Sequence, residues 1–375
     1  MATQQQNIGE VLQFFNEARR PVKSSDRVPG PFPYLGASGT VDYVEGFTHE
    51  GSYLCVSEDG ANLLTRSLPI AWVQDGKFWA NNHLQVLGGV SREHLTFFRY
   101  AIESTNIAAY VTGSAQPKLS KASLSSVKVP KFSRGEEERI GKLLSAIDDK
   151  IAANNRAKDI ELDLIKTLGG KPTNTVKLSV LCERSTRSIK PEAIEAKTVL
   201  HYSLPAFDLG APTQEEPATI KSNKFSLERP CVLLSKLNPH SPRIWSVPVI
   251  NEDVPMIASS EFVVLRPTTC SQAQLFAATA QPELFHHLES LTGGTSKSHQ
   301  RVRPADILTS EVPDTRTLSA EESQMLELLT LRFESLVVEN QALARTRDEL
   351  LPLLMNGRIT VGEVENAADE AASES

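Results

Sequence analysis

Two segments of this 375-residue chain carry one pattern: SRGEEERIGKLLSAIDDKIAANNRAKDIELDLIKTLGG at 133–170 and SAEESQMLELLTLRFESLVVENQALARTRDELLPLLMNG at 319–357. Each begins with Ser-x-x-Glu, which predicts a capping box at the start of a helix. A Val-Pro pair precedes each segment by a few residues. Gly169-Gly170 and Asn356-Gly357 are typical helix ends. We therefore expect two long helices, related by an internal repeat.

Apolar side chains recur every three or four residues along both segments, which is the pattern of a coiled-coil seam. They are Ile140, Leu144, Ile147, Ile151, Leu162 and Ile165, and then Leu326, Leu329, Phe333, Leu336, Leu343, Leu350 and Leu354. Asn154 and Asn340 interrupt the two seams at equivalent places, where a polar residue often sets the register. Each helix should span roughly 50 Å at about 1.5 Å per residue. The alternative is that each helix packs only on its own globular half.

The segments before these helices, residues 1–132 and 171–318, repeat more loosely. Tyr53–Ser57 resembles Cys231–Ser235, and residues 83–87 resemble 261–265 at nearly the same offset. Further strands are predicted at 69–73 and 243–249, and helices at 91–107 and 272–291. Each half is therefore predicted to be an α+β domain. An ordered repeat of this kind indicates a pseudo-symmetric molecule with two equivalent working surfaces.

Composition gives few constraints on function. The net charge is −7, but residues 1–132 and 171–318 each carry +1, residues 133–170 carry −1 and residues 319–375 carry −8. The globular halves are thus close to neutral, which does not exclude a nucleic-acid partner. The four cysteines lack CxxC spacing, so neither a metal site nor a disulfide framework is expected. No signal-like or membrane-spanning run is present, so a cytoplasmic protein without a membrane partner is expected.

No catalytic motif stands out, since the chain has neither a Gly-rich phosphate loop nor HExxH. Polar loops follow or precede the predicted strands, and Asn, Gln, Arg and Lys are the side chains that read DNA base edges. The alternative is ordinary solvated turns. The loop residues that we select as DNA-binding candidates are Asp59, Asn62, Asn81, Asn82, His83, Gln116, Lys118, Lys236, Asn238, His240, Arg243, Lys297, His299, Gln300, Arg301 and Arg303.

The sequence resembles the specificity subunit of Type I restriction–modification systems over nearly its whole length, through about residue 361. The resemblance is carried by residues 33–39, 58–64 with Arg66, 78–83, 234–239 and 347–357. Ser38 and Arg66 lie in these stretches and complete the set of DNA-binding candidates. One departure is Ser133–Glu137, which replaces the usual Pro-Glu-Gln start of the first helix.

The resemblance implies an α+β fold with two pseudo-symmetric, α/β-mixed target-recognition domains, separated by two long helices that form an antiparallel coiled coil. The expected parts are target-recognition domain 1 (1–132), a central spacer helix (133–170), target-recognition domain 2 (171–318), a distal spacer helix (319–358) and an acidic, disordered tail (359–375). Each domain would read half of a bipartite site in double-stranded DNA, and the helices would set the distance between the halves.

The resemblance also implies partners that carry the chemistry. Similar proteins bind two modification subunits, which are adenine methyltransferases, and ATP-dependent restriction subunits that translocate DNA. S-adenosylmethionine and ATP with Mg²⁺ would bind to those partners, so this chain is expected to be a non-catalytic subunit that holds no cofactor. Another reading is a duplicated coiled-coil scaffold that does not itself read DNA. A nuclease or methyltransferase fused to a recognition domain is disfavoured by the length and by the missing motifs.

Overall fold

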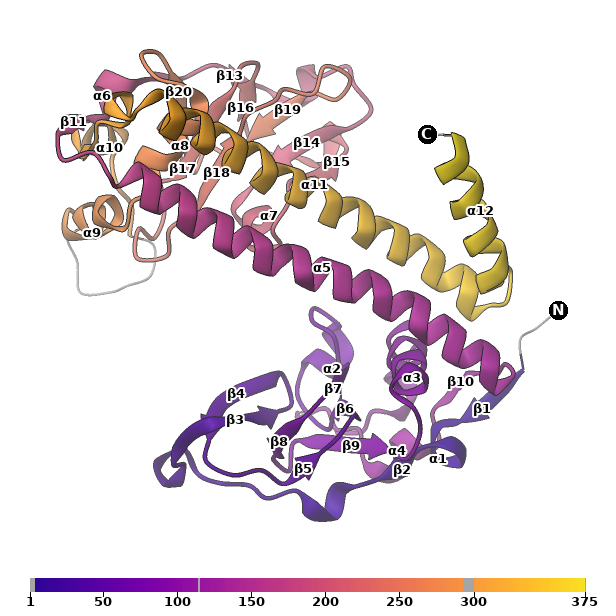
Figure 1. The fold of residues 1–375 in the computed structure, drawn as a ribbon. Coiled ribbons are helices and arrows are strands. Elements are labelled where there is room, and N and C mark those ends of the chain that lie inside the picture. Colours follow the sequence, from indigo (N-terminus) through magenta and orange to yellow (C-terminus); the bar gives the residue numbers. More distant parts are fainter. Residues whose placement is uncertain (1–3, 114, 293–299, 375) are drawn as a thin grey trace. The chain divides into compact units, whose positions relative to one another are not determined.

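The computed structural model describes residues 4–113, 115–292 and 300–374 and divides into two compact units (Figure 1). Unit 1 consists of Met1–Ile151 and Leu343–Ser375, and unit 2 consists of Ala152–Ala342. Each unit therefore contains one globular half together with part of each long helix. The units follow the repeat that the sequence predicts.

Unit 1 contains two four-stranded sheets, of order β2-β9-β6-β7 and β4-β3-β8-β5, and the antiparallel pair β1-β10. Helix α3 packs on the first sheet through Leu95, Phe98 and Ile102, which are fully buried. The elements of the unit before its long helix are β1 (Gln5–Asn7), α1 (Ile8–Val11), β2 (Gln13–Phe14), η1 (Asn16–Ala18), η2 (Ser24–Asp26), β3 (Pro29–Gly36), β4 (Gly39–Val44), β5 (His49–Glu50), β6 (Tyr53–Ser57), α2 (Asn62–Thr65), β7 (Ala71–Gln74), β8 (Lys77–Ala80), β9 (Leu84–Gly88), α3 (Arg92–Ser104), η3 (Ala108–Tyr110), α4 (Lys121–Ser125) and β10 (Lys128–Pro130).

Unit 2 repeats this plan, with sheets of order β12-β20-β17-β18 and β13-β16-β19-β14-β15 and the antiparallel pair β11-β21. Its elements between the long helices are β11 (Thr175–Lys177), α6 (Leu178–Leu181), β12 (Cys182–Ser185), β13 (Ser188–Ile189), η4 (Pro191–Ala193), β14 (Val199–Tyr202), α7 (Leu204–Asp208), β15 (Thr213–Glu215), η5 (Pro217–Thr219), β16 (Lys224–Leu227), β17 (Cys231–Ser235), β18 (Ile244–Val247), β19 (Met256–Ala258), β20 (Phe262–Pro267), α8 (Gln272–Thr279), α9 (Pro282–Ser290), α10 (Pro304–Thr309), β21 (Glu311–Pro313) and η6 (Thr315–Thr317).

The central sheets of the two units share one register. Ser57 of β6 lies opposite Leu84 of β9, and Ser235 of β17 lies opposite Phe262 of β20. The neighbouring strands also correspond, because Cys55 pairs with Trp72 where Leu233 pairs with Trp245. The predicted strands 53–57 and 231–235 are confirmed at these bounds. Nearly every residue of β6 and β17 is buried, so both are central strands covered on both faces of their sheets.

The two long helices are α5 (Arg134–Gly169) and α11 (Ala320–Met355), each of 36 residues. In unit 2 they run antiparallel: Asn154 Nδ2 donates to Asn340 Oδ1 at 2.9 Å, and Arg332 pairs with Glu161 at 2.7 Å. In unit 1, Arg347 pairs with Asp148 at 2.9 Å. The predicted antiparallel helix pair is therefore confirmed within each unit, with the two seam asparagines bonded to each other.

The ends of both helices also belong to the globular cores. Ile140 and Leu144 of α5 and Leu354 of α11 are buried in the core of unit 1. Ile165 of α5 and Leu326 of α11 are buried in the core of unit 2. Pairing of the helices and packing on the globular halves are therefore not exclusive alternatives. Each globular half packs on the start of the helix that follows it and on the end of the other helix.

The predicted helix 272–291 is wrong as one element, because it is divided into α8 and α9 at Pro282. Proline has no N–H to continue a helix but suits the first turn, where Pro282 begins α9. Only the second capping box is complete: Ser319 and Glu322 bond reciprocally at 3.0 and 3.1 Å. In the first, Glu136 N donates to Ser133 Oγ at 3.3 Å, while the carboxylate of Glu136 accepts from Val361 N at 3.4 Å.

The expectation of a disordered tail at 359–375 is wrong for most of its length, since Val361–Glu374 forms helix α12. Thr360 and Glu363 form a reciprocal cap, with N–O distances of 2.7 and 3.3 Å. Val361 is 2% exposed and belongs to the core of unit 1. Alanine and glutamate favour helix, and this capped, anchored start offsets the acidity of the segment. Across the described residues, no helix is long and apolar enough to cross a membrane.

Candidate nucleic-acid interface

Beyond strand β6, three loops of unit 1 are joined by backbone hydrogen bonds. Glu58 N donates to His83 O at 3.0 Å, Leu119 N donates to Glu58 O at 2.7 Å, and Gly60 N donates to Pro117 O at 3.0 Å. Residues 58–60, 81–83 and 116–118 therefore form one surface, which we call tip 1. It unites Asp59, His83 and Lys118, three candidates that are far apart in the sequence.

Unit 2 builds the corresponding surface with the same bonds. Lys236 N donates to Glu261 O at 2.9 Å, Val302 N donates to Lys236 O at 2.9 Å, and Asn238 N donates to Gln300 O at 2.8 Å. We call residues 236–240, 261 and 300–301 tip 2. Isolated bridges join Asp59 to Lys118 in tip 1 and Leu237 to Arg301 in tip 2. Lys118 and Arg301 thus occupy equivalent positions.

The charges of tip 1 are arranged around two acids. Glu58 has a side chain that is only 11% exposed, and it pairs with Arg19 at 2.6 Å and with Lys118 at 3.2 Å. Asp59 Oδ2 lies 2.6 Å from His83 Nδ1. The Lys118 side chain remains 54% exposed. Glu58 has two basic partners. If a polyanion drew Lys118 away, Arg19 would still neutralise the Glu58 carboxylate.

Tip 2 reverses the charge at its centre, because Lys236 stands where tip 1 has Glu58. Burial lowers the pKa of Lys236 below its ordinary value, and the charges of Arg184 and Arg301 lower it further against the opposing charge of Glu261. Arg301 Nη2 lies 2.8 Å from Glu261 Oε1, and the Arg301 side chain is 63% exposed. Lys236 and Arg301 of tip 2, with Arg184 beside them, therefore surround one nearby anion, Glu261.

Other candidates lie on or beside tip 1. Ser38 is exposed in the turn between β3 and β4, and Ser57 Oγ donates to Ala37 O, which holds that turn against the end of β6. Asn82 and Gln116 are exposed. Asn81 is 8% exposed, and its Oδ1 accepts from His83 N at 2.8 Å, so its side chain shapes the loop.

Four candidates are held by structural partners instead. Asn62 Oδ1 accepts from Leu68 N at 3.0 Å and closes a turn, and Arg66 binds Glu103 at the end of α3. Arg243 pairs with Asp208 at 2.7 Å through both carboxylate oxygens. Arg303 makes the same kind of pair with Asp306 at the start of α10, at 2.8 Å. We leave these four side chains out of the proposed site because they lie outside the backbone-joined loops that form the two tips.

The remaining candidates belong to unit 2. His240 is exposed in the loop before β18, and Gln300 Oε1 accepts from Thr292 Oγ1 at 3.2 Å. Asn238 has a left-handed backbone with φ of 52°, a conformation that asparagine tolerates better than most residues. Lys297 and His299 lie outside the described residues.

Sequence reasoning missed a basic segment beside tip 1. Arg20 and Lys23 are exposed, and Arg27 stacks on Tyr34 at 4.2 Å and pairs with Asp42 at 3.1 Å. Lys23, Arg27 and Tyr34 line a hollow of about 330 Å³ together with residues 81–83. Four basic residues within 19–27 are visible in the sequence as a charge cluster, and that signal could have selected the segment.

Sequence reasoning also missed a cation beside tip 2. Arg184 is exposed on β12, and its charge acts on Lys236. The sequence around Arg184 contains no motif. Its position near Lys236 becomes visible only in the folded chain, where β12 pairs with β20. Within the described part of the chain, no group of three or more His, Cys, Asp and Glu side chains could hold a metal ion.

The comparisons with known proteins agree with this architecture. Residues 3–163 match the family model of the Type I restriction modification DNA specificity domain. A putative type I restriction enzyme specificity subunit of Haemophilus influenzae is 39% identical over 140 residues, which are 37% of this chain. That match covers 36% of the relative, so the chain spans about a third of the length of the curated protein it matches.

The crystal structure of a Type I restriction–modification S subunit from M. genitalium has the same fold. It superposes with a TM-score of 0.62 at 13% identity, over 94% of this chain and 96% of that chain. The likeness extends the common fold to both units, although the sequence match lies in the first. Residues 3–163 are therefore similar to the Type I restriction modification DNA specificity domain, and the chain as a whole shares the fold of the S subunit from M. genitalium.

Proposed function

We propose that this protein is the DNA sequence-recognition subunit of a Type I restriction–modification complex, in which tip 1 and tip 2 each read one half of a bipartite duplex site. The observation that carries the proposal is the duplicated tip. Identical backbone bonds hold both surfaces, while the side chains differ at the central position, Glu58 in one and Lys236 in the other. Two surfaces with the same backbone arrangement and different side chains can read two different half-sites.

The chemistry of the tips supports this role. Lys118 and Arg301 are exposed cations at equivalent positions, and arginine and lysine commonly donate to O6 and N7 of guanine. Asn82 and Gln116 add exposed amides at tip 1, and such amides can pair with adenine. Arg20, Lys23 and Arg184 lie beside the tips and would contact phosphates, which position a protein on DNA without reading sequence.

Partner recruitment is the second part of the proposal. Large apolar side chains are exposed on the outer faces of the helix pair in unit 2: Ile160, Leu164, Met325, Leu328, Leu331 and Val338. Apolar surface of this extent on helices supports protein contacts. We propose that the complex contains two modification subunits and restriction subunits, and that S-adenosylmethionine and ATP with Mg²⁺ bind to those subunits. The chain alone would then transfer no methyl group and cut no DNA.

Equivalent substitutions in the two tips test the proposal. The complex with the modification subunit is used to select sites from a randomised duplex pool, with Lys118→Ala and Arg301→Ala compared with the unaltered chain. A lost base-edge contact costs about 1–3 kcal/mol at one position, so each variant should relax one half of the site and leave the other unchanged. A phosphate contact would instead weaken all duplexes alike and reduce the salt slope by about one.

Two outcomes would contradict the proposal. If both substitutions relax the same half-site, the tips do not read separate halves. If the complex selects no sequence from the pool, the duplicated scaffold that does not read DNA is the better account. Arg303→Ala is a matched control, because Arg303 pairs with Asp306 and lies outside the proposed site.

A further inference from the structure

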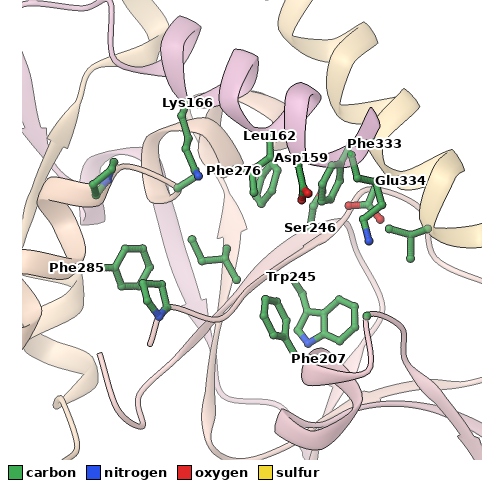
Figure 2. Close-up of a pocket in the computed structure, with 17 residues that line it drawn as sticks. Asp159, Leu162, Lys166, Phe207, Trp245, Ser246, Phe276, Phe285, Phe333 and Glu334 are labelled. Carbon is green, nitrogen blue, oxygen red and sulfur yellow. The ribbon is translucent and has the colours of Figure 1, made fainter. Parts of the chain in front are cut away.

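Unit 2 contains a cavity of about 410 Å³ between the long helices and the central sheet. Five aromatic side chains line it together with Lys158, Asp159 and Lys166 of α5, and Figure 2 shows Phe207 beside Trp245 and Phe333 above them. The aromatic side chains that line it are Phe207, Trp245, Phe276, Phe285 and Phe333. The ring centroids of Phe207 and Trp245 are 5.1 Å apart and the two rings are nearly perpendicular. The volume lies in the range of small-molecule sites, which is about 300–1,000 Å³.

In unit 1 the corresponding place is occupied by side chains of the unit itself. Asp148 and Glu334 stand the same number of residues after the starts of α5 and α11. Tyr100 and Ala280 stand the same number of residues after the capping serines of α3 and α8. Tyr100 donates to Asp148, which also pairs with Arg99 and Arg347.

In unit 2 the tyrosine is replaced by Ala280, which lines the cavity together with Glu334. An alanine lacks the ring and the hydroxyl that reach the carboxylate in unit 1. Helix α3 also continues past Tyr100 to Ser104, whereas α8 ends at Thr279 with Ala280 as its C-cap, so the cavity lies where both the side chain and the helix are shorter in unit 2. Residues from α5, α7, β18, α8, α9 and α11 line it, all within unit 2.

Two polar groups that line the cavity can form hydrogen bonds with a ligand. Trp245 is 7% exposed, and its Nε1 has no hydrogen-bond partner among the described residues. Glu334 accepts a hydrogen bond from Ser246, and burial raises the pKa of the Glu334 carboxyl to about 8, against the lowering effects of that bond and of Lys158. The carboxyl is therefore largely protonated at neutral pH, and it offers an O–H donor beside a carbonyl acceptor.

We propose that this cavity binds a small planar nitrogen heterocycle of the nucleobase type, stacked among the aromatic rings with its donor–acceptor edge on Glu334. A ring nitrogen or carbonyl of the same molecule would accept from Trp245 Nε1. The aromatic walls favour a flat ring over an aliphatic ligand. A group with a neighbouring donor and acceptor complements a neutral carboxyl by two hydrogen bonds. This inference does not depend on the proposed function.

Calorimetric titration of the full-length chain with adenine and cytosine tests the proposal, and indole serves as a purely aromatic control. Adenosine and a short single-stranded oligonucleotide distinguish a free base from one carried by a nucleic acid. We expect at least one base to saturate with a stoichiometry of one. Indole should bind at least about tenfold more weakly, which corresponds to about 1.4 kcal/mol. Absence of saturation by every base-containing probe would overturn the proposal, and so would equal binding of indole.

Two substitutions assign the binding to the cavity. Ala280→Tyr places the unit 1 side chain in unit 2, where its ring fills the space and its hydroxyl can reach Glu334, so binding should fall at least about tenfold. Thermal unfolding shows that this variant remains folded. The matched control is Ala109→Tyr, since Ala109 is exposed in unit 1. Glu334→Gln should preserve binding at neutral pH and remove its weakening above a pH of about 8. Unchanged binding in Ala280→Tyr would sink the assignment.

Discussion

Asp148 in unit 1 and Glu334 in unit 2 occupy equivalent helix positions, but their surroundings are opposite. Asp148 accepts from Tyr100 and pairs with two arginines, whereas Glu334 faces a cavity lined by aromatic rings. The tips differ in the same way, with Glu58 in one and Lys236 in the other. Backbone hydrogen bonds and strand register are common to both units, because they do not depend on side-chain identity. The comparison shows that the repeat preserves the frame and varies the surfaces that the frame presents.

The largest effect is expected from lengthening α5 and α11, because both units contain part of each helix. Four residues inserted after Ala153 in α5, with four more after Asn340 in α11, add about one turn to each helix, or roughly 6 Å. That length is comparable to one or two base pairs of about 3.4 Å. If the helices set the distance between the half-sites, this variant should select the same two halves with a longer gap. Mapping of methylated sites measures the gap.

A two-residue insertion at both places is the control for this experiment. Two residues rotate the apolar seam away from its partner, since a turn needs about 3.6 residues. We expect that variant to lose sequence-specific binding. The helices would not determine spacing if the four-residue variant kept the original gap.

A smaller effect is expected on the free energy of unfolding, where substitutions of Asp148 and Glu334 should differ. Asp148→Ala leaves Arg99 and Arg347 without their shared anion, and removal of one partner from a largely buried ion pair costs about 3 kcal/mol. Glu334→Gln retains the hydrogen-bonding edge beside Ser246, so its cost should be under about 1 kcal/mol. Urea unfolding of the full chain measures both. Asp149→Ala is the control, because Asp149 is exposed and its pair with Arg92 at 3.7 Å contributes at most about 1 kcal/mol. Equal losses for Asp148 and Glu334 would contradict the comparison.

The smallest effect is a difference in pH dependence. Burial alone would raise the pKa of Asp148, but Arg99, Tyr100 and Arg347 lower it below its ordinary value of 3.8, so its contribution is lost as pH falls through the acidic range. Burial raises the pKa of Glu334 from 4.5 to about 8, so the folded state binds more protons than the unfolded state between these values. Its contribution to stability therefore falls as pH rises from 4.5 to about 8.

Glu334→Gln removes this titration and isolates its effect. The unaltered chain should lose about 1 kcal/mol of unfolding free energy relative to the variant between acidic and mildly alkaline conditions, because one pKa unit corresponds to about 1.4 kcal/mol and water in the cavity screens part of the burial. Urea midpoints at a pH of about 5 and a pH of about 8 provide the measurement. Parallel pH profiles for the two proteins would mean that Glu334 is ionised throughout.

Much of the frame could be predicted from the sequence because its signals are local. Periodic apolar residues, Ser-x-x-Glu caps and terminal glycines identify α5 and α11, and short apolar runs identify β6 and β17 at their observed bounds. Two predictions were wrong although the sequence contained the signals against them. Pro282 marks the start of a second helix within 272–291, and the alanine-rich composition of the tail favours helix α12. The outer sheets were missed, since strands such as β5 and β13 are two residues long and are defined by their partners.

The sequence by itself determined the duplication, the antiparallel helices' apolar seams and the polar loops that form the tips. Tertiary structure alone decided which loop residues meet: Lys118 joins Asp59 and His83, while Arg66 and Arg243 are taken up by Glu103 and Asp208. It also decided that Ala280 leaves a cavity where Tyr100 fills one. The physical reason is that secondary structure follows from neighbours along the chain, whereas charge pairing and packing depend on side chains brought together from distant segments.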